Sequence, residues 1–471
     1  MKKIIIAVLL FVVAFITYVI FSVVIVYKRQ PKISAEYISS FDPDDFFSDQ
    51  VSCDRACVIE DNMQALIERL RMIERASERI ILSTFDFRAD NSGKKVLAAL
   101  YNAANKGVEV KILIDGYCEM IHMKNNPYFM ALSTLDNVEI KIYNPINILK
   151  PWKSMGRLHD KYLIIDNELY LLGGRNTNDN FLGENGHKNY DRDVLVYNTR
   201  PDTRDSSIYE LYNYFDKIWN MKECRYFHDK ASKGKKKKVF KAVEELKNIY
   251  LETMQKYPFL TEEFDYTAVT YKVNKISFLT NPVHIKAKEP TLFYSLISLM
   301  KKAKEEVKIH TPYIICNEMM YEALKEVCKG KANVTLMTNS PANNDNPFGA
   351  SDYMLHKGKI LDTGINIYEY EGGISYHGKS ITIDHNISII GSFNMDLRSV
   401  YLSTEIMLVA DSTDLNKQLK NYMNYYEEAS VRVIDLERVE MPEGLKRQEF
   451  TDKKEILVKI IKLFNRFRYL M

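Results

Sequence analysis

The sequence predicts an α/β protein that is built from two tandem lobes of similar fold and preceded by one membrane-spanning helix. Three observations predict this architecture. A long apolar run stands near the N-terminus, helices and strands alternate after it, and the second half of the chain repeats the pattern of the first. The predicted organisation is a membrane anchor over 1–30, a stalk over 31–60, lobes over 61–270 and 271–435, and a basic amphipathic tail over 436–471.

The apolar run extends from Ile4 to Val26, which is long enough to cross a hydrocarbon core of about 30 Å as a helix. A cleaved signal peptide is the alternative. Its apolar region is shorter and is followed by small residues, whereas here Tyr27, Lys28 and Arg29 follow. We therefore expect an uncleaved, single-pass membrane anchor. Basic residues flank both ends of the run, so their distribution hardly distinguishes the two orientations. We favour the orientation with the short N-terminus in the cytoplasm and the lobes facing outward.

Hydrophobic periodicity predicts the same order of elements in each half. In the first half, helices are predicted over 63–77 and 94–106, and strands over 79–86, 108–115, 137–143, 160–166 and 168–173. In the second half, helices are predicted over 290–304 and 317–329, and strands over 306–311, 333–337, 365–370, 379–384 and 386–391. This repetition indicates a tandem duplication.

Charge and cysteine content narrow the class of protein. A net charge of only +3 argues against a molecule that binds nucleic acid over its whole surface. The basic run 233–238 is interpreted as a solvated loop before a helix over 239–256, with contact to anionic headgroups or nucleic acid as the alternative. The tail over 453–471 either packs on the second lobe or lies on a membrane. The cysteine spacing predicts no zinc site, and Cys53 and Cys57 form either a small disulfide or free thiols.

One motif stands out from this background. The pattern His-x-Lys occurs five times, but only His159 and His377 are followed seven residues later by Asp. The two copies read LHDKYLIID and YHGKSITID. The paired positions, all separated by 218 residues, are His159 and His377, Lys161 and Lys379, Asp166 and Asp384, and Asn176 and Asn394. Four polar positions kept in register across a duplication indicate a shared chemical role.

Two histidines and two lysines suit the exchange of a phosphodiester. One imidazole attacks phosphorus and forms a phospho-histidine, while the other protonates the leaving alkoxide and then deprotonates the incoming alcohol or water. The ammonium groups neutralise the phosphate, so no metal or other cofactor is expected. The predicted catalytic set is His159, Lys161, Asp166, His377, Lys379 and Asp384, with Asn176, Asn394 and Ser392 as phosphate-binding residues. Asp166 and Asp384 have the alternative role of supporting the turn.

Each imidazole also needs a carboxylate that sets its tautomer and stabilises its charge. The downstream candidates are Asp193, in the segment NYDRDV, and Glu405, in the segment LSTEIM.

With these motifs, residues 60 to 430 resemble the phospholipase D superfamily. The segments NPINILKPWKSMGRLHDKYLIID, GGRNTNDNF and LMTNSPANNDNP make the chain similar to bacterial cardiolipin synthases. The resemblance implies phospholipase D-like α/β sandwich lobes related by a pseudo-twofold axis, and an active site at their interface. It also implies that His159 is the nucleophile and His377 the acid and base. Family members often carry two N-terminal membrane helices or none, whereas one is predicted here.

Three activities fit this pattern. The first is a cardiolipin synthase, which transfers a phosphatidyl group between phosphatidylglycerol molecules and releases glycerol. The second is a phospholipase D that uses water as acceptor, and the third is an anchored nuclease. The anchor and the basic tail favour a phospholipid substrate at a membrane, and nucleic acid is not the expected partner. The sequence predicts no oligomeric state.

Overall fold

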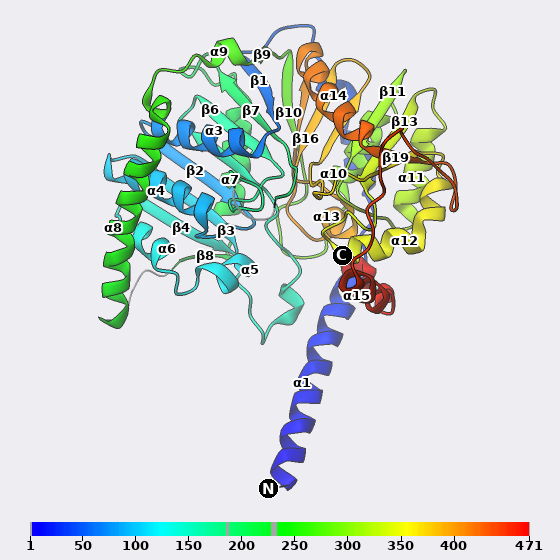
Figure 1. Ribbon diagram of the computed structural model, residues 1–471, viewed down its shortest axis with the longest axis horizontal. Coiled ribbons are helices and arrows are strands. Elements are labelled where there is room, and N and C mark those ends of the chain that lie inside the picture. Colours follow the sequence, from blue (N-terminus) through cyan, green and yellow to red (C-terminus); the bar gives the residue numbers. More distant parts are fainter. Residues whose placement is uncertain (1, 185–187, 228–232, 471) are drawn as a thin grey trace.

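A computed structural model describes residues 2–184, 188–227 and 233–470. Two α/β lobes lie side by side, and a single long helix, α1 (Lys2–Lys28), projects away from them (Figure 1). Each lobe is organised around a large mixed sheet. The predicted fold class is therefore confirmed, and the predicted strands and helices agree with the observed ones to within a few residues at most ends.

The sheet of the first lobe runs in the order β8-β4-β3-β2-β5-β6-β7-β1-β9. Its strands are β1 (Asp54–Ile59), β2 (Arg79–Thr84), β3 (Glu109–Asp115), β4 (Val138–Tyr143), β5 (Tyr162–Ile165), β6 (Leu169–Gly173), β7 (Asp193–Asn198), β8 (Cys224–Tyr226) and β9 (Tyr271–Lys272). Its helices are α3 (Asn62–Arg75), α4 (Asn91–Asn105), α5 (Gly116–Cys118), α6 (Pro127–Leu132), α7 (Ile208–Trp219), α8 (Lys233–Lys256) and α9 (Tyr266–Val269).

The sheet of the second lobe runs in the order β10-β18-β16-β15-β11-β13-β14-β19-β20. Its strands are β10 (Lys275–Thr280), β11 (Glu306–His310), β13 (Asn333–Asn339), β14 (Asn366–Tyr370), β15 (Ser380–Ile383), β16 (Ile387–Gly391), β18 (Ile406–Asp411), β19 (Ser430–Val433) and β20 (Val439–Glu440). A small separate sheet pairs β12 (Ile314–Ile315) with β17 (Met395–Asp396). The helices are α10 (Thr291–Met300), α11 (Glu318–Cys328), α12 (Pro347–Leu361), α13 (Leu397–Tyr401) and α14 (Thr413–Glu428).

The two sheets have the same topology. In the first lobe β2 pairs in parallel with β3 and antiparallel with β5, and in the second lobe β11 pairs in the same way with β13 and β15. The equivalence continues outward through β6 and β16, β7 and β18, and β1 and β10. Only β9 and β20 break it, at opposite edges. The duplication seen in the sequence is therefore a duplication of the fold.

The lobes share a buried interface. One hydrophobic cluster contains Tyr170 and Val194 of the first sheet, Ile390 and Leu408 of the second, and side chains of α7 and α14. Each lobe has a further core on the outer side of its own sheet. The lobes are thus packed as one body by apolar side chains, which holds the two halves of any site between them at a set distance.

The segment predicted as a stalk is folded onto the lobes. The short helix α2 (Ala35–Ser40) packs on α10, where the Tyr37 hydroxyl lies 2.8 Å from that of Ser295. Strand β1 then lies inside the first sheet, between β7 and β9. The first lobe therefore begins before residue 61. Cys53 and Cys57, near the end of this segment, are free thiols.

The C-terminal tail packs beside the upper end of α1 (Figure 1). Its helix α15 (Asp452–Lys462) lies against α12 and buries Val458 and Ile461. Of the two expected arrangements, the structure shows packing on the second lobe. The basic run over 233–238 is not the loop that was predicted, because it forms the start of α8, on the outer side of the first lobe (Figure 1).

Candidate active site

His159 is bound to the opposite lobe. It lies just before β5, and a β-bridge between Leu158 and Thr404 joins this segment to the second lobe. The Thr404 hydroxyl accepts a hydrogen bond from the His159 amide at 3.1 Å, and Nδ1 of the imidazole lies 3.0 Å from the Glu405 carboxylate. Glu405 is fully buried. The first motif histidine is therefore oriented by an acid of the second lobe.

His377 shows the reciprocal arrangement. A bridge between Tyr190 and Tyr376 joins its segment to the first lobe, and the Tyr190 carbonyl accepts a hydrogen bond from the His377 amide. Nδ1 of the imidazole lies 2.6 Å from the carboxylate of Asp191, which is also fully buried. Each imidazole also has an aromatic ring at its edge, Phe85 for His159 and Phe181 for His377. Each lobe thus supplies the carboxylate for the histidine of the other lobe, and the two pairs are related by the pseudo-twofold axis.

A buried lysine accompanies each histidine. The Lys161 ammonium donates to the His159 carbonyl, and the Lys379 ammonium lies 2.6 Å from Nδ1 of His377. Burial lowers the pKa of Lys161 to about 7 and that of Lys379 to about 8, although nearby carboxylates oppose the shift. Burial, followed by the charges of Lys161, Lys379 and His377, lowers the pKa of His159 well below its usual value. Because charges of the second motif act on the first, both motifs belong to one site.

The two carboxylates differ in their electrostatic surroundings. Burial opposes ionisation of Asp191, but the charges of Lys379 and His377 outweigh it and lower the Asp191 pKa to about 2. Burial raises the pKa of Glu405 to about 7 against the opposing charge of Lys161. The hydroxyls of Ser392 and Ser399 both donate to Glu405. Ser392, which we expected at the phosphate, therefore positions the acid behind His159.

The expectation for Asp193 is wrong. Its carboxylate lies 3.0 Å from Arg69 and 3.2 Å from Arg175, and the acid at His377 is Asp191. Strand register explains the difference. Gly173 pairs with Asp193, and Gly391 pairs with Met407, so the residue two before each partner is Asp191 in one lobe and Glu405 in the other. The loop before β7 is longer than its counterpart before β18, which removes the constant offset of 218 from the sequence.

Asp166 and Asp384 lie outside the catalytic site, at the turns after β5 and β15. Both have a left-handed backbone, with φ of 47° and 46°. The Asp166 carboxylate accepts hydrogen bonds from the amides of Ser77, Glu78 and Arg79, and Asp384 accepts from those of Lys304, Glu305 and Glu306. Each aspartate thus anchors the start of the neighbouring strand, β2 or β11. The alternative role, support of the turn, is the one that the structure shows.

Replacement of Asp166 by alanine should lower stability rather than turnover. The change removes a charged acceptor from three amides and places alanine in a left-handed conformation, which together cost about 2–4 kcal/mol. Urea unfolding should show this loss, while kcat per folded molecule stays within about twofold of the wild-type value. Asp166→Asn is the control, because asparagine tolerates the left-handed backbone and keeps one acceptor oxygen. A large loss of kcat at unchanged unfolding midpoint would contradict the structural role.

The motif asparagines, Asn176 and Asn394, lie on the loops that follow β6 and β16. Asn176 accepts a hydrogen bond from the Asp86 amide at 3.2 Å, and Asn394 donates to the Tyr313 hydroxyl at 3.2 Å. The side-chain oxygen of Asn394 is buried and has no hydrogen-bond partner among the described residues. Their contact with phosphate remains a prediction.

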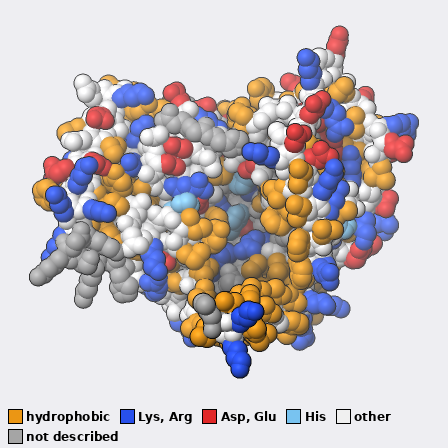
Figure 2. Space-filling view, turned by 60° about the horizontal axis from the view of Figure 1, so that its bottom comes forward, with side chains coloured by type: hydrophobic (Ala, Val, Ile, Leu, Met, Phe, Trp, Pro, Cys, Tyr) orange, Lys and Arg blue, Asp and Glu red, His pale blue; other side chains and the backbone are white. Residues whose placement is uncertain are grey.

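The site opens into a hollow between the lobes. The side chains of His159 and His377 are 17% and 12% exposed, whereas their carboxylate partners are fully buried. Figure 2 shows histidine side chains and basic side chains, lysine or arginine, in this hollow and hydrophobic side chains around it. Because Nδ1 of each imidazole faces a carboxylate, Nε2 is the nitrogen that remains for the substrate.

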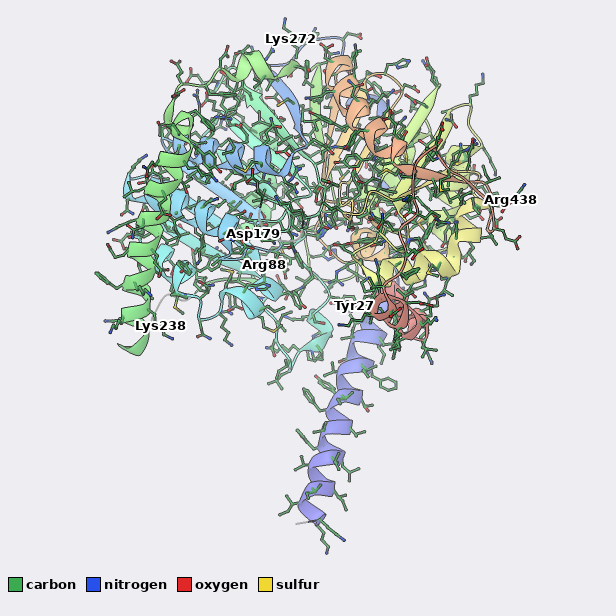
Figure 3. All side chains as sticks on the ribbon, in the orientation of Figure 1. Tyr27, Arg88, Asp179, Lys238, Lys272 and Arg438 are labelled. Carbon is green, nitrogen blue, oxygen red and sulfur yellow. The ribbon has the colours of Figure 1, made fainter. Side chains whose placement is uncertain are left out.

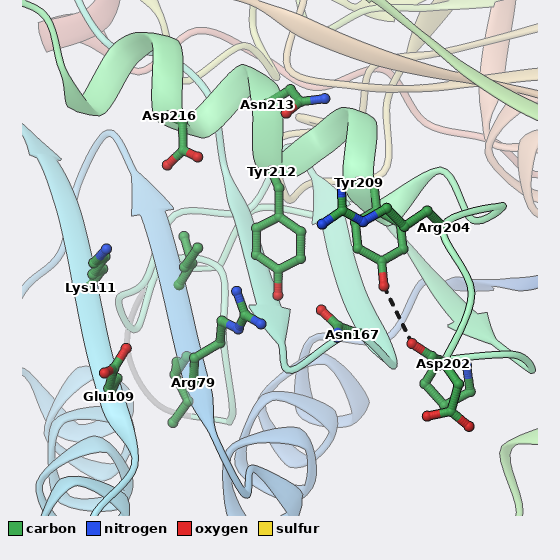
Figure 4. Close-up of a pocket in the computed structure, with 13 residues that line it drawn as sticks. Arg79, Glu109, Lys111, Asn167, Asp202, Arg204, Tyr209, Tyr212, Asn213 and Asp216 are labelled. Carbon is green, nitrogen blue, oxygen red and sulfur yellow. Dashed lines mark hydrogen bonds between the residues drawn. The ribbon is translucent and has the colours of Figure 1, made fainter.

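A cavity of about 690 Å³ lies elsewhere, between the first sheet and α7 (Figure 4). Its lining combines cations and anions, including Arg79, Lys111, Glu109 and Asp216. The Tyr209 hydroxyl donates to the Pro201 carbonyl at 3.3 Å on one side of it. No motif residue is among the described side chains that line this cavity. It therefore takes no part in the chemistry of the histidines.

The lysines should make activity fall on the alkaline side. A lysine neutralises phosphate only while it is protonated. The value of kcat/KM should therefore decrease as pH rises through about 7, where Lys161 of the substrate-free enzyme loses its proton. In Lys161→Arg this limb should move up to about pH 8, where Lys379 titrates, because a guanidinium stays charged. The measurement is a pH profile of kcat/KM, with Lys247→Arg on α8 as the control. An unchanged limb in Lys161→Arg would show that Lys161 is not the titrating group.

Comparisons with known proteins agree with this geometry. Residues 70–219 and 296–426 match the family described as "Cardiolipin synthase, PLD-like domain". An uncharacterized protein of Helicobacter pylori is 26% identical over 407 residues, which is 78% of each chain. Cardiolipin synthase 1 of Staphylococcus epidermidis is 28% identical over 353 residues, 74% of this chain and 63% of the relative.

A solved structure shares the fold. The crystal structure of the phosphatidylserine synthase of Haemophilus influenzae Rd KW20 superposes with a TM-score of 0.62 at 15% identity, over 94% of this chain and 95% of that one. The family match covers both lobes and includes both histidine motifs. This chain therefore belongs to the phospholipase D superfamily of phosphatidyltransferases and phosphodiesterases, in the family described as "Cardiolipin synthase, PLD-like domain".

Proposed function

We propose that the protein is a membrane-anchored phosphatidyltransferase that makes cardiolipin and glycerol from two molecules of phosphatidylglycerol. The observation that carries the proposal is the pair of imidazoles, each bound to a carboxylate of the opposite lobe and accompanied by a buried lysine. Such a pair suits a double displacement at phosphorus, in which one nitrogen attacks while the other transfers protons. Similarity to cardiolipin synthases supports phosphatidylglycerol as the substrate.

In the first half of the reaction, Nε2 of His159 attacks the phosphorus of phosphatidylglycerol. A nitrogen–phosphorus bond forms and the bond from phosphorus to the glycerol oxygen breaks. The leaving alkoxide takes a proton from Nε2 of His377 and departs as glycerol. Glu405 stabilises the positive charge on His159, and the ammonium groups of Lys161 and Lys379 stabilise the charge on the non-bridging oxygens.

The second half reverses these roles. A headgroup hydroxyl of another phosphatidylglycerol gives its proton to Nε2 of His377, and its oxygen attacks the phosphatidyl-histidine. The new oxygen–phosphorus bond completes cardiolipin, and the bond to His159 breaks. Asp191 stabilises the imidazolium of His377 in both halves, because it stays ionised down to a pH of about 2.

The proposed anchor is α1. Within the described residues it is the one helix long and apolar enough to cross a membrane. Its last turn is part of the folded protein, since Tyr27 is buried in the core of the second lobe and donates a hydrogen bond to the Trp152 carbonyl at 2.7 Å. A cleaved signal peptide would leave that position empty, so this packing supports retention of the helix. We assign the short N-terminus to the cytoplasm and the lobes to the outer side. Protease treatment of intact cells tests this orientation, because only lobes that face outward are digested.

The test of function is a product analysis. Full-length protein in vesicles or mixed micelles receives phosphatidylglycerol with a labelled glycerol headgroup, in the presence of a chelator, and lipids are separated by mass. We expect one cardiolipin and one free glycerol for every two substrates consumed, and no turnover by His159→Ala. Phosphatidic acid that carries oxygen from labelled water would show a phospholipase D instead. Absence of any lipid product would reject both activities.

A further inference from the structure

Apolar side chains surround the base of α1. Ile148 and Leu149, in the loop after β4, are each 67% exposed, and Trp152 is 37% exposed. Leu463 and Phe464, just after α15, are 75% and 52% exposed. We call these five side chains the apolar collar. Figure 2 shows hydrophobic side chains gathered at this end of the molecule, next to the hollow.

The loop of the apolar collar is attached to α1 itself. The Tyr18 hydroxyl donates to the Leu149 carbonyl at 3.2 Å, and the Tyr27 hydroxyl donates to the Trp152 carbonyl at 2.7 Å. The loop therefore runs along α1 over its last three turns. Exposed Leu149 reaches further from the lobes than Trp152, to the level of Tyr18.

This attachment places the loop at a calculable depth. A hydrocarbon core of about 30 Å takes about 20 residues of helix, so the apolar run from Ile4 to Val26 puts its outer boundary between Val23 and Val26. Tyr18 lies five to eight residues deeper, about 8–12 Å below that boundary. Helical side chains point toward the N-terminus, so the Tyr18 hydroxyl is no shallower than its backbone. Leu149 therefore lies below the boundary, at a depth typical of interfacial apolar residues.

The tail holds the other part of the apolar collar beside α1. Arg468 lies 2.6 Å from Asp352 of α12, and Arg398 donates to the Leu470 carbonyl at 3.1 Å. These contacts follow Leu463 and Phe464 directly in the chain and fix their position. Packing of α15 on α12 covers its opposite side, so the exposed apolar side chains face away from the lobe.

Basic residues lie at the same end of the molecule. Lys150 is exposed between Leu149 and Trp152. Lys238, in the basic run at the start of α8, lies at the same lower end as Tyr27 (Figure 3). Lysines next to an interfacial apolar surface bind anionic headgroups. This end of the molecule therefore presents apolar side chains next to α1 and positive charge further from it. Both would contact a flat anionic lipid surface.

We propose that the apolar collar inserts into the interfacial layer of the bilayer beside α1, so that the hollow with His159 and His377 opens onto the lipid headgroups. The inference rests on the proposed anchoring by α1. Substrate then passes from the bilayer into the site over apolar side chains, without entering water. Because α1 is docked at both Tyr18 and Tyr27, the lobes sit on the membrane in one orientation rather than on a flexible tether.

Tryptophan fluorescence tests the depth. The chain has two tryptophans, and Trp219 is 5% exposed within the first lobe, so Trp219→Phe leaves Trp152 as the only reporter. Full-length protein is reconstituted in vesicles of phosphatidylcholine and phosphatidylglycerol whose acyl chains carry bromine near the headgroup or near the terminal methyl. We expect Trp152 to be quenched, more strongly by the shallow bromines. Trp152→Phe, which keeps only Trp219, is the control and should not be quenched. Absence of quenching of Trp152 by either lipid would overturn the proposal, whatever reaction the enzyme catalyses.

Charge substitution tests the consequence. In Ile148→Asp/Leu149→Asp, quenching of Trp152 should fall by at least half, and turnover of phosphatidylglycerol in vesicles by about tenfold. Turnover of a short-chain, water-soluble phosphodiester should stay unchanged. The matched control is Ile434→Asp/Leu436→Asp, 44% and 67% exposed, near Arg438 and away from α1 (Figure 3). Equal loss on both substrates, or equal loss in the control, would overturn the role of the collar.

Discussion

Replacement of His159 by alanine should lower kcat/KM for phosphatidylglycerol by at least about 10⁴-fold. His377→Ala should show a loss of similar size on the natural lipid, because the reaction needs both the nucleophile and the proton donor. The two variants should differ on a substrate with a p-nitrophenolate leaving group, which departs without a proton. His377→Ala should then release one p-nitrophenolate per enzyme in a burst and retain a covalent phosphoryl group, whereas His159→Ala should show no burst.

The matched control for both variants is His385→Ala. His385 is 67% exposed and pairs with Glu305 on the surface. Its substitution therefore removes an imidazole without changing the site. Its kcat/KM should equal that of the wild type. A burst in His159→Ala and none in His377→Ala would reverse the assignment of nucleophile and acid. No burst in either variant, with no labelled enzyme, would argue against a covalent intermediate.

Asp191→Asn and Asp193→Asn should differ although the two residues are neighbours. In Asp191→Asn, His377 loses the charge that stabilises its imidazolium, and kcat should fall by about 10³–10⁴-fold. Burial and the charge of Lys379 lower the His377 pKa, and the charge of Asp191 opposes them. Without that negative charge the limb of the kcat profile that reports His377 should move to still lower pH. A merely structural role would not move this limb.

Asp193→Asn should act on stability instead. It leaves the buried guanidinium groups of Arg69 and Arg175 without their carboxylate, which costs about 3–5 kcal/mol. Urea unfolding of both variants, beside kcat per folded molecule, separates the effects. The assignment fails if Asp193→Asn moves the pH limb and Asp191→Asn does not.

Local patterns predicted most of the fold. Apolar periodicity located α3, α4, α10 and α11 and five adjacent strands of each sheet, because period 2 and period 3.6 are visible in any short window. Helices α7, α12 and α14 and strands such as β7 and β18 were not predicted. The residues of α12, over 347–361, form no distinct apolar stripe. The segment over 31–60 was expected to be a stalk, because a strand that pairs with a distant β7 has no local signature. Elements that pack only against segments distant in the sequence cannot be predicted from short sequence windows.

The sequence by itself determined the duplication, the apolar helix and the reactive groups His159, Lys161, His377 and Lys379, because each depends on residue type and spacing alone. The sequence also named Glu405 as one of the two acids. Only the tertiary structure decided which acid serves which histidine, and it replaced Asp193 by Asp191. The contact between His377 and Asp191 joins residues 186 positions apart, and that between His159 and Glu405 joins residues 246 apart. It also gave supporting roles to Asp166 and Asp384, which were predicted to be catalytic, and to Ser392, which was predicted to bind phosphate. Such partners depend on strand register and on the packing of one lobe against the other, and neither leaves a trace in local sequence.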